Sequence, residues 1–424
     1  MDTLYLGIDV GTSGVRSCII DETAAIRAGA STPLPAPGRM GAAVEQDPEI
    51  WWTALTENLE QLRAQRSLAP VAAITLDGTS STLLCCDASG RPLGPALMYN
   101  DARATREAQR IAGIAPPDCA AHGPSASLAK LLWLQQSPFC KYARHILHQA
   151  DWLLGRLCGH FGTSDENNAL KLGYDVIQRR WPDWLQALDV PMTLLPTVVP
   201  AGHETGTLAA QAGERWGLST DTRILAGTTD STASFIATGA GPGDAVTSLG
   251  STLVLKVLAD QPVFAPAYGI YSHRLGDRWL VGGASNTGGA VLKAHFTAAE
   301  IEQFAALINP DETTGLDYYP LLADGERFPV NDPALAPRLQ PRPADDVLFY
   351  QGILEGIANI EVRGYQKLAE LGAPWPKRIM TTGGGAANAP WRKMRSRLTG
   401  IPVTAATHQE AAYGAALLSL KGSS

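Results

Sequence analysis

The feature that most constrains this chain is a strand–turn–strand segment near its start. An apolar run from Leu4 to Ile8 leads to Asp9, and a turn of Gly, Thr and Ser residues precedes a second apolar run, Val15–Ile20. Such a turn can present backbone N–H groups and hydroxyls to an anion, while the acid meets the metal that accompanies a phosphate. Taken alone, the segment fits an ordinary hairpin equally well.

The length of the chain predicts two domains. A single hydrophobic core rarely grows beyond about 250–300 residues, and this chain has 424. A loop-rich stretch precedes a restart of the strand pattern at Arg223. We therefore expect an N-terminal domain over residues 1–222 and a C-terminal domain over residues 223–424.

Charge and hydropathy argue against binding to nucleic acid and against a membrane-spanning segment. The chain has 34 Lys and Arg against 41 Asp and Glu, a net charge of −7, without the basic excess typical of nucleic-acid binding. No apolar run approaches the ~18 residues that suggest a membrane span. Because the first strand begins by residue 4, we expect no signal peptide and a cytoplasmic protein.

The cysteines and histidines show no metal-binding pattern. None of the six cysteines forms a C-x-x-C pair, and Cys85 and Cys86 are direct neighbours. We expect reduced, mostly buried thiols. The eight histidines are scattered without ligand spacing, so a structural zinc site is not expected.

The second half of the chain repeats the strand–turn–strand pattern of the first. The strand Arg223–Ala226 ends in a turn that carries Asp230, and the strands Asp244–Leu249 and Thr252–Leu258 flank a Gly-Ser-Thr turn. A further strand, Arg378–Thr381, runs into a glycine-rich loop. This alternation predicts an α/β fold of two related domains, with a ligand cleft between them.

Four motifs in this order resemble those of the FGGY carbohydrate kinases, which have two actin/hexokinase/Hsp70-like (ribonuclease H-like) domains. The motifs are Asp9–Ser13, Gly227–Asp230, Ser248–Thr252 and Thr382–Asn388, and the helix residues Gln351–Ala358 are similar to the family's signature. The resemblance implies phosphorylation of a sugar, with ATP and Mg²⁺ as cofactors. A non-catalytic nucleotide or sugar sensor on the same fold is the alternative.

Two segments resemble a subgroup, the compact pentulose kinases of cyanobacteria and plants, whose sugar is D-ribulose. These are Ile74–Ser80 and Asn168–Tyr174. The Met-His turn typical of xylulokinases is replaced by Asp77-Gly78-Thr79-Ser80. The resemblance implies phosphorylation of the terminal (5-) hydroxyl of D-ribulose, with D-xylulose, L-ribulose and polyols such as ribitol as alternatives.

The resemblance also assigns roles around the sugar. Asp230 would be the general base and contact the sugar; capping the helix that begins at Ser231 is the alternative. Asp9 would bind the sugar and, like Asp230, approach Mg²⁺ through water. Ser80 and Asp77 would hydrogen-bond the sugar.

The remaining implied contacts are with ATP. Thr12, Ser13 and Arg16 would face the γ-phosphate, although Arg16 fits a surface strand position equally well. Gly250, Ser251 and Thr252 would face the β- and γ-phosphates. The adenosine would lie against Gly383, Gly384, Gly385, Asn388 and Trp391, where Trp391 is alternatively a core residue. The expected partners are the sugar and ATP, and the protein would be a monomer or homodimer.

Overall fold

The structure is a computed structural model that describes residues 3–422, which form two compact units. Unit 1 comprises the described residues up to Ala237 together with those from Glu410 onward, and unit 2 comprises Thr238–Gln409. This division differs from the predicted boundary at 222/223. Strand β13 (Arg223–Thr229) pairs with β6 (Val71–Gly78), and the last helix packs on β1, so both belong to unit 1.

The main sheet of unit 1 has the strand order β12-β13-β6-β1-β2-β3. Its other strands are β1 (Leu4–Val10), β2 (Gly14–Asp21), β3 (Ile26–Pro33) and β12 (Glu204–Thr207). The predicted opening hairpin is confirmed, since β1 and β2 are antiparallel with Val10 opposite Val15. Strands β1, β6 and β13 run parallel, so their carboxyl ends meet at one edge.

Unit 1 also contains a small sheet of order β4-β5-β8-β7-β9 and a separate pair, β10 with β11. The strands are β4 (Gly38–Met40), β5 (Ala43–Gln46), β7 (Leu83–Cys86), β8 (Ala96–Leu97), β9 (His145–His148), β10 (Thr163–Asp165) and β11 (Thr197–Val199). Strands of two to four residues such as these carry little periodicity, so sequence patterns give a weak signal for them.

The first helix of unit 1 follows its sequence signals. The Asp47 side chain accepts a hydrogen bond from the Glu49 N–H at 3.0 Å, and Trp51 and Leu55 are fully buried. The unit 1 helices are α1 (Pro48–Gln65), α2 (Thr105–Ala112), α3 (Ser127–Gln135), α4 (Gln149–Cys158), α5 (Glu166–Ala169), α6 (Ala210–Trp216), α7 (Asp230–Ala237) and α12 (Ala411–Lys421), with short 3₁₀ turns η1 (Pro138–Tyr142), η2 (Leu170–Leu172), η3 (Asp183–Leu188) and η4 (Met192–Leu194).

The sheet of unit 2 repeats the pattern of the first, with order β16-β17-β15-β14-β18-β19. Its strands are β14 (Asp244–Leu249), β15 (Leu253–Ala259), β16 (His273–Leu275), β17 (Arg278–Ser285), β18 (Arg378–Thr382) and β19 (Val403–Ala405). Strand β14 is antiparallel to β15 and parallel to β18, as β1 is to β2 and β6. The predicted repeat of the first hairpin is therefore confirmed.

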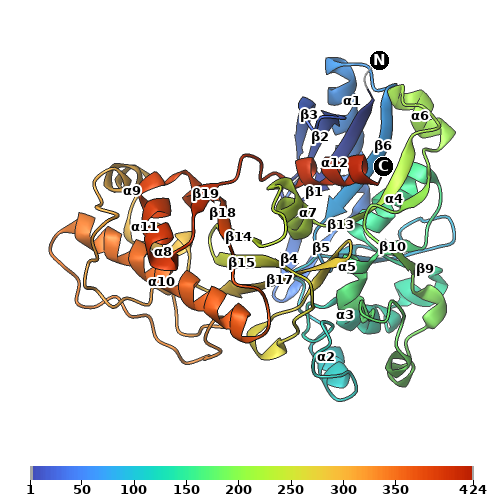
Figure 1. Cartoon of the computed structure of the whole chain (residues 1–424). Coiled ribbons are helices and arrows are strands. Elements are labelled where there is room, and N and C mark those ends of the chain that lie inside the picture. Colours follow the sequence, from blue (N-terminus) through green and yellow to red (C-terminus); the bar gives the residue numbers. More distant parts are fainter. Residues whose placement is uncertain (1–2, 423–424) are drawn as a thin grey trace. The chain divides into compact units, whose positions relative to one another are not determined.

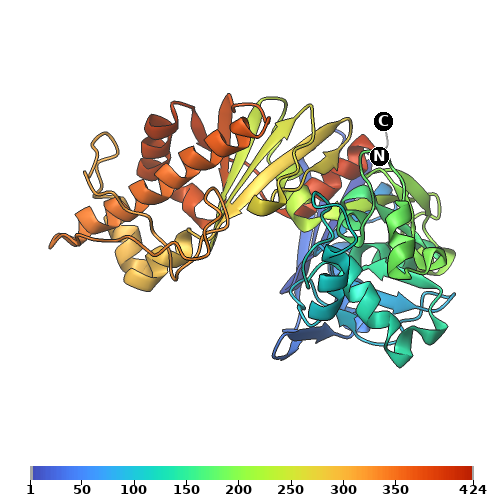
Figure 2. The same cartoon turned by 90° about the horizontal axis from the view of Figure 1, so that it is seen from below.

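Four helices belong to unit 2, and Figures 1 and 2 show α10 and α11 lying next to each other. The helices are α8 (Gly289–His295), α9 (Ala298–Ala305), α10 (Asp346–Glu370) and α11 (Ala389–Thr399), with 3₁₀ turns η5 (Pro266–Tyr268) and η6 (Gly384–Ala387). Across residues 3–422, no helix is both long enough and apolar enough to cross a membrane.

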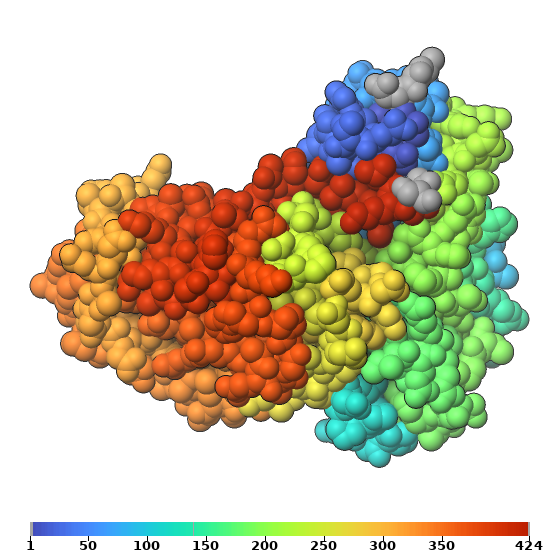
Figure 3. Space-filling model, in the orientation of Figure 1, coloured from blue at the N-terminus to red at the C-terminus, as the bar shows by residue number. Residues whose placement is uncertain are grey.

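The C-terminal helix α12 completes the core of unit 1. Figures 1 and 3 show this red helix against blue N-terminal segments, and it packs on β1, β2, β6 and α7. Glycine at position 7 allows the approach, because a Cβ there would lie 2.0 Å from the Ala416 nitrogen and 2.1 Å from the Ala412 oxygen. The middle of β1 therefore packs directly against the backbone of α12.

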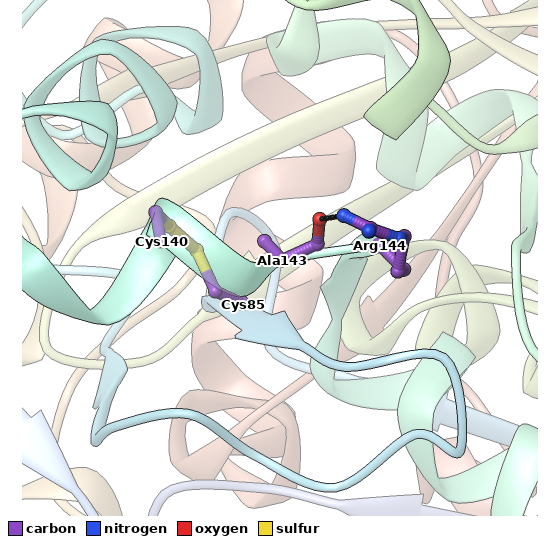
Figure 4. The surroundings of a disulfide bond; sticks show 4 residues. All are labelled: Cys85, Cys140, Ala143 and Arg144. Carbon is purple, nitrogen blue, oxygen red and sulfur yellow. Dashed lines mark hydrogen bonds between the residues drawn. A yellow bond between two sulfur atoms is a disulfide. The ribbon is translucent and has the colours of Figure 1, made fainter.

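A disulfide joins Cys85 on β7 to Cys140 in η1 (Figure 4), with their Cα atoms 6.0 Å apart. The prediction that all the cysteines are thiols is wrong for these two. They are separated by 55 positions, and only the fold brings them together. Cys18, Cys86, Cys119 and Cys158 are free thiols.

We expect Gly7→Ala to reduce the free energy of unfolding by about 1–3 kcal/mol or more, because the new methyl group overlaps the α12 backbone. Gly38→Ala is the matched control, since its nearest neighbour would lie at 3.6 Å, and we expect a change within about 0.5 kcal/mol. Urea unfolding monitored by fluorescence measures both variants. Equal stability of the two would contradict the packing of α12 on β1.

Candidate active site

Three carboxyl groups gather at one edge of the unit 1 sheet. Asp9 lies near the end of β1, Asp77 lies opposite it on β6, and Asp230 directly follows β13. Strand pairing places Thr228, two residues before Asp230, opposite Asp77. Ligands of parallel α/β sheets commonly bind at the carboxyl ends of the strands. We call this end of the sheet, which carries the three predicted acids Asp9, Asp77 and Asp230, the acid edge.

Asp9 is almost completely buried and pairs with Arg16. The Arg16 Nη1 atom lies 3.3 Å from the Asp9 Oδ2 atom, because the hairpin register sets the two residues opposite each other. Burial raises the pKa of Asp9, while hydrogen bonding with Asp77 and the charge of Arg16 oppose this and Glu410 adds to it. Arg16 therefore contacts the acid edge while its side chain stays partly exposed.

Asp77 is fully buried. Burial raises its pKa well above the usual range, and the charges of Asp9 and Asp230 raise it further. With both groups ionised, neither Asp77 oxygen has a hydrogen-bond partner in the described chain; a protonated Asp77 can donate to Asp9. The Asp77 carboxyl group thus interacts with Asp9, and its predicted contact with the sugar stays a prediction.

Asp230 is the first residue of α7, and its Oδ1 accepts a hydrogen bond from the Ser231 N–H at 2.5 Å. The helix expected from Ser231 therefore begins one residue earlier, at Asp230 itself. A lysine in η2, Lys171, interacts electrostatically with Asp230; burial lowers the Lys171 pKa, and Asp230 opposes the shift. Sequence reasoning did not single out Lys171, although it lies within the motif Asn168–Tyr174.

Ser80 lies half-exposed in the loop after β6. The loop is anchored from α4, where the Gln149 Oε1 accepts hydrogen bonds from the Thr79 N–H at 3.0 Å and the Thr79 hydroxyl at 2.8 Å. Thr79 and Ser81 on either side are buried. Ser80 is therefore the accessible hydroxyl of this loop.

A buried acid supports the strand that leads to Asp230. Asp165 accepts hydrogen bonds from the Asn167 N–H at 2.8 Å and the Asn168 side chain at 2.6 Å, while the Asn167 amide donates to the Thr228 hydroxyl at 3.0 Å. Burial raises the pKa of Asp165 to about 7, with a further contribution from Asp151, while the Asn168 contacts oppose it. This network ties α5 to β13.

In unit 2, the predicted second phosphate turn packs against the start of α8. The Gly289 N–H donates to the Gly250 carbonyl at 2.9 Å, and the Ala290 N–H donates to the Ser251 carbonyl at 3.1 Å. A Cβ on Gly289 would lie 2.7 Å from the Gly250 oxygen. The N–H groups of Ser251 and Thr252 donate to no backbone carbonyl of the described chain, so they are available to an anion.

Gly250 and Ser251 of the same turn line a cavity of about 610 Å³ within unit 2. Its walls are mainly apolar and aromatic, and they come from α8, α9, α10, η6 and α11. The lining residues are Leu249, Gly250, Ser251, Gly289, Leu292, Lys293, Phe296, Thr297, Ala298, Ile301, Tyr350, Gly384, Gly385, Asn388 and Trp391. Such a volume and lining suit a flat heteroaromatic ligand joined to a polar group.

Asn388 and Trp391 are the side chains of the predicted adenosine loop in this cavity. Asn388 caps α11 by accepting from the Trp391 N–H at 2.9 Å, and its amide donates to the Tyr350 hydroxyl at 3.3 Å. Trp391 is almost fully buried, and its Nε1 donates to the Leu354 carbonyl at 3.0 Å. Trp391 is therefore a core residue that also lines the cavity.

A buried ion pair holds α11 in place. The Arg395 guanidinium contacts both Glu361 carboxylate oxygens at 2.6 Å and donates to the Thr381 hydroxyl at 2.8 Å. The Thr247 hydroxyl donates to Glu361 at 2.5 Å. Thr247 and Thr381 lie on β14 and β18, just before the two predicted nucleotide loops, so this bidentate pair joins the elements that carry them.

Comparison with known proteins decides the family. Residues 4–237 match the N-terminal domain of the FGGY family of carbohydrate kinases, and residues 245–422 match its C-terminal domain. The chain belongs to the FGGY family. It is an ATP-dependent carbohydrate kinase, which transfers a phosphoryl group to an alcohol, and the predicted two-domain actin-like fold is confirmed.

Two comparisons describe its place in the FGGY family. The xylulose kinase of Escherichia coli K12 is 27% identical over 94% of this chain and 85% of its own. The solved structure of a kinase from Brucella ovis, described as a xyloylose kinase, matches with a TM-score of 0.88 and 26% identity, covering 99% of this chain and 91% of the other.

Two kinases with other named substrates match at lower identity. The gluconokinase of Bacillus subtilis is 22% identical over 99% of this chain and 88% of its own. A Plasmodium falciparum glycerol kinase with ADP, 18% identical, has the same fold with a TM-score of 0.87, covering 100% of this chain and 90% of the other. These comparisons do not show that the chain belongs to the predicted D-ribulose kinase subgroup.

Asp165 should make stability fall as the pH rises from about 4 to 7. Its pKa of about 7 in the folded chain exceeds the ~3.9 of an unfolded aspartate, so the folded state keeps a proton that the unfolded state loses. The contribution is complete below pH 4 and is lost as the pH passes 7, by up to about 1.4 kcal/mol per pH unit. Urea unfolding of Asp165→Asn should therefore show a flatter pH dependence than wild type. Parallel curves of unfolding free energy against pH for Asp165→Asn and wild type would contradict this prediction.

Proposed function

We propose that this FGGY kinase transfers the γ-phosphoryl group of ATP to the terminal (5-) hydroxyl of a pentulose. The observation that carries the proposal is the gathering of Asp9, Asp77 and Asp230 at one sheet edge, beside a Gly-Thr-Ser turn. A kinase needs a base for the attacking hydroxyl and positive charge for the phosphates. Asp230 would supply the first, and Arg16 part of the second.

Asp230 is our candidate for the general base. Its position at the start of α7 keeps it half-exposed, unlike the fully buried Asp77. The sugar O–H bond breaks as its oxygen bonds to the γ-phosphorus, the proton passes to the Asp230 carboxylate, and ADP leaves with the electrons of the broken P–O bond. Lys171 would stabilise the carboxylate form of Asp230.

Asp9 and Asp230 are the residues we assign to Mg²⁺, through water. In residues 3–422, no three His, Cys, Asp or Glu side chains are placed to hold a metal together. This donor set fits Mg²⁺, which commonly binds one or two carboxylates and takes its other ligands from water and phosphate. When bound, Mg²⁺ would neutralise phosphate charge. Asp9 would also hydrogen-bond the sugar, with Asp77 behind it and Ser80 as a second contact.

We assign the nucleotide to the following groups. The unit 2 cavity, which Gly384, Gly385, Asn388 and Trp391 line, would bind adenosine, with Gly383 in the same loop but outside the lining. Gly250 and Ser251, which also line the cavity, and Thr252 next to them would meet the β- and γ-phosphates. Thr12, Ser13 and Arg16 would bind the γ-phosphate. The free N–H groups of Ser251 and Thr252 support this assignment.

D-Xylulose is the first candidate sugar, because the E. coli and Brucella ovis relatives are named for it. D-Ribulose is the second. It is supported by the sequence Asp77-Gly78-Thr79-Ser80, which differs from the Met-His turn typical of xylulokinases and resembles the compact pentulose kinases. Ser80, the accessible hydroxyl of that turn, would distinguish the two sugars.

A coupled ADP-release assay over a sugar panel tests the proposal. The panel is D-xylulose, D-ribulose, L-ribulose, ribitol, glycerol and gluconate. We expect one pentulose to give a kcat/KM at least tenfold above the polyols and gluconate. If ATP binds but no sugar is phosphorylated, the protein is a sensor. A preference for glycerol, ribitol or gluconate would overturn the pentulose assignment.

Asp230→Asn should lower kcat by about 10²–10⁴-fold, because the amide cannot accept the hydroxyl proton. The Kd for ATP, measured by calorimetry, should stay within twofold of wild type. Asp221→Asn, at an exposed loop position of the same unit, is the matched control and should leave both values unchanged. Near-normal turnover in Asp230→Asn would remove Asp230 from the base role.

A further inference from the structure

Lys130 is a lysine with no exposed surface, in helix α3 of unit 1. Its Nζ atom donates hydrogen bonds to three backbone carbonyls: Ser81 at 2.7 Å, Met98 at 2.7 Å and Tyr99 at 3.3 Å. An ammonium group has three N–H donors, so these carbonyls use all of them. Buried lysines usually pair with a carboxylate, and this one instead binds main-chain oxygens.

The nearby charged groups do not compete for Lys130. Asp101 interacts with Lys130 electrostatically but accepts no hydrogen bond from it. The Asp101 carboxylate instead accepts hydrogen bonds from the Arg103 guanidinium and the Val44 N–H. Arg103 and Lys171 act through their like charges. Burial lowers the pKa of Lys130 to about 7, and Asp101 opposes this shift. The geometry of the three carbonyls therefore defines what Lys130 does.

The Ser81 carbonyl belongs to a residue with a strained backbone conformation. Ser81 has a φ of +68°, a left-handed conformation that residues with a side chain rarely adopt. Its hydroxyl is buried and has no hydrogen-bond partner within the described chain, so the side chain does not offset the strain. The contact from Lys130 fixes the carbonyl of this strained residue.

Ser80 lies between two such anchors. Gln149 on α4 holds Thr79 on one side, and Lys130 on α3 holds Ser81 on the other. Both anchors are buried, while Ser80 stays half-exposed. The other two carbonyls bound by Lys130, of Met98 and Tyr99, fasten the loop to the end of the small sheet.

We propose that Lys130 is a positioning residue for the sugar: by binding the Ser81 carbonyl it keeps the loop in the left-handed turn that presents the Ser80 hydroxyl. This inference rests on the proposed contact of Ser80 with the sugar. The ammonium acts through the main chain and does not touch the substrate. Without it, Ser81 relaxes toward an ordinary backbone conformation and Ser80 turns away.

The test is Lys130→Met, which keeps the length of the side chain and removes its donors. We expect the KM for the sugar to rise at least tenfold, while the KM for ATP stays within twofold. Lys141→Met, an exposed lysine of the same unit, is the control and should change neither. A role limited to stability would lower the amount of active enzyme and leave both KM values unchanged.

Rescue by a second substitution makes the test specific. Glycine adopts a φ of +68° without strain, so Ser81→Gly should restore most of the sugar affinity when added to Lys130→Met. Ser81→Gly alone should resemble wild type, since the lost hydroxyl makes no hydrogen bond. If Lys130→Met does not fold, Lys130→Leu, which also has no donors, provides the same comparison with and without Ser81→Gly.

Two results would overturn the proposal: an unchanged sugar KM in the Lys130 variant, or equal changes in both KM values that Ser81→Gly does not relieve. A wild-type protein that binds ATP but phosphorylates no sugar would instead contradict the proposed function itself, so the two failures are distinguishable.

Discussion

The candidate active site depends on the register of β1 against β6. Pairing Ile8 with Leu76 sets Asp9 beside Asp77, and the neighbouring pairing of β6 with β13 brings Asp230 to the same edge. A shift of one residue would turn these side chains to the opposite face of the sheet. The register is held by burial on both faces, with α12 packed closely over Gly7. The chemistry of the first strand thus depends on the last helix.

Burial then gives similar side chains different tasks. Burial within the sheet raises the pKa of Asp77. Asp9 is nearly buried but contacts Arg16, and Asp230 stays half-exposed at the start of a helix. Carboxyl groups in different environments can divide acid, base and ligand roles among themselves. Unit 2 contributes a different chemistry, a mainly apolar cavity lined in part by a turn whose Ser251 and Thr252 N–H groups donate to no backbone carbonyl of the described residues.

Local signals predicted much of this molecule. The Asp47 cap and the spacing of Trp51 and Leu55 are local signals from which α1 can be predicted. The Gly-Thr-Ser turn of the first hairpin and the Gly-Ser-Thr turn of the second predicted the repeat of β1–β2 in β14–β15. The motifs also placed the three acids and the two glycine-rich loops. Their roles as base, metal ligand and nucleotide contacts remain predictions.

What the sequence did not predict depends on contacts between distant residues. The return of α12 to the first sheet, the Cys85–Cys140 disulfide and the short strands of the small sheet have no periodic or capping signal. Lys130 in α3 lies among apolar residues at helical spacing, and nothing local shows that it binds the Ser81 carbonyl. The electrostatic interaction of Lys171 with Asp230 likewise joins residues that are far apart in the sequence.

The central claim is that the sugar binds at the acid edge of unit 1 and the adenosine in the unit 2 cavity. Hydrogen–deuterium exchange of the wild-type protein, with one ligand at a time, tests it most directly. AMP should slow exchange in residues 249–252, 289–301 and 383–391, and the preferred sugar should slow it in residues 9–16, 77–82 and 228–231. Protection of the acid edge by AMP, or of the cavity segments by the sugar, would contradict the account.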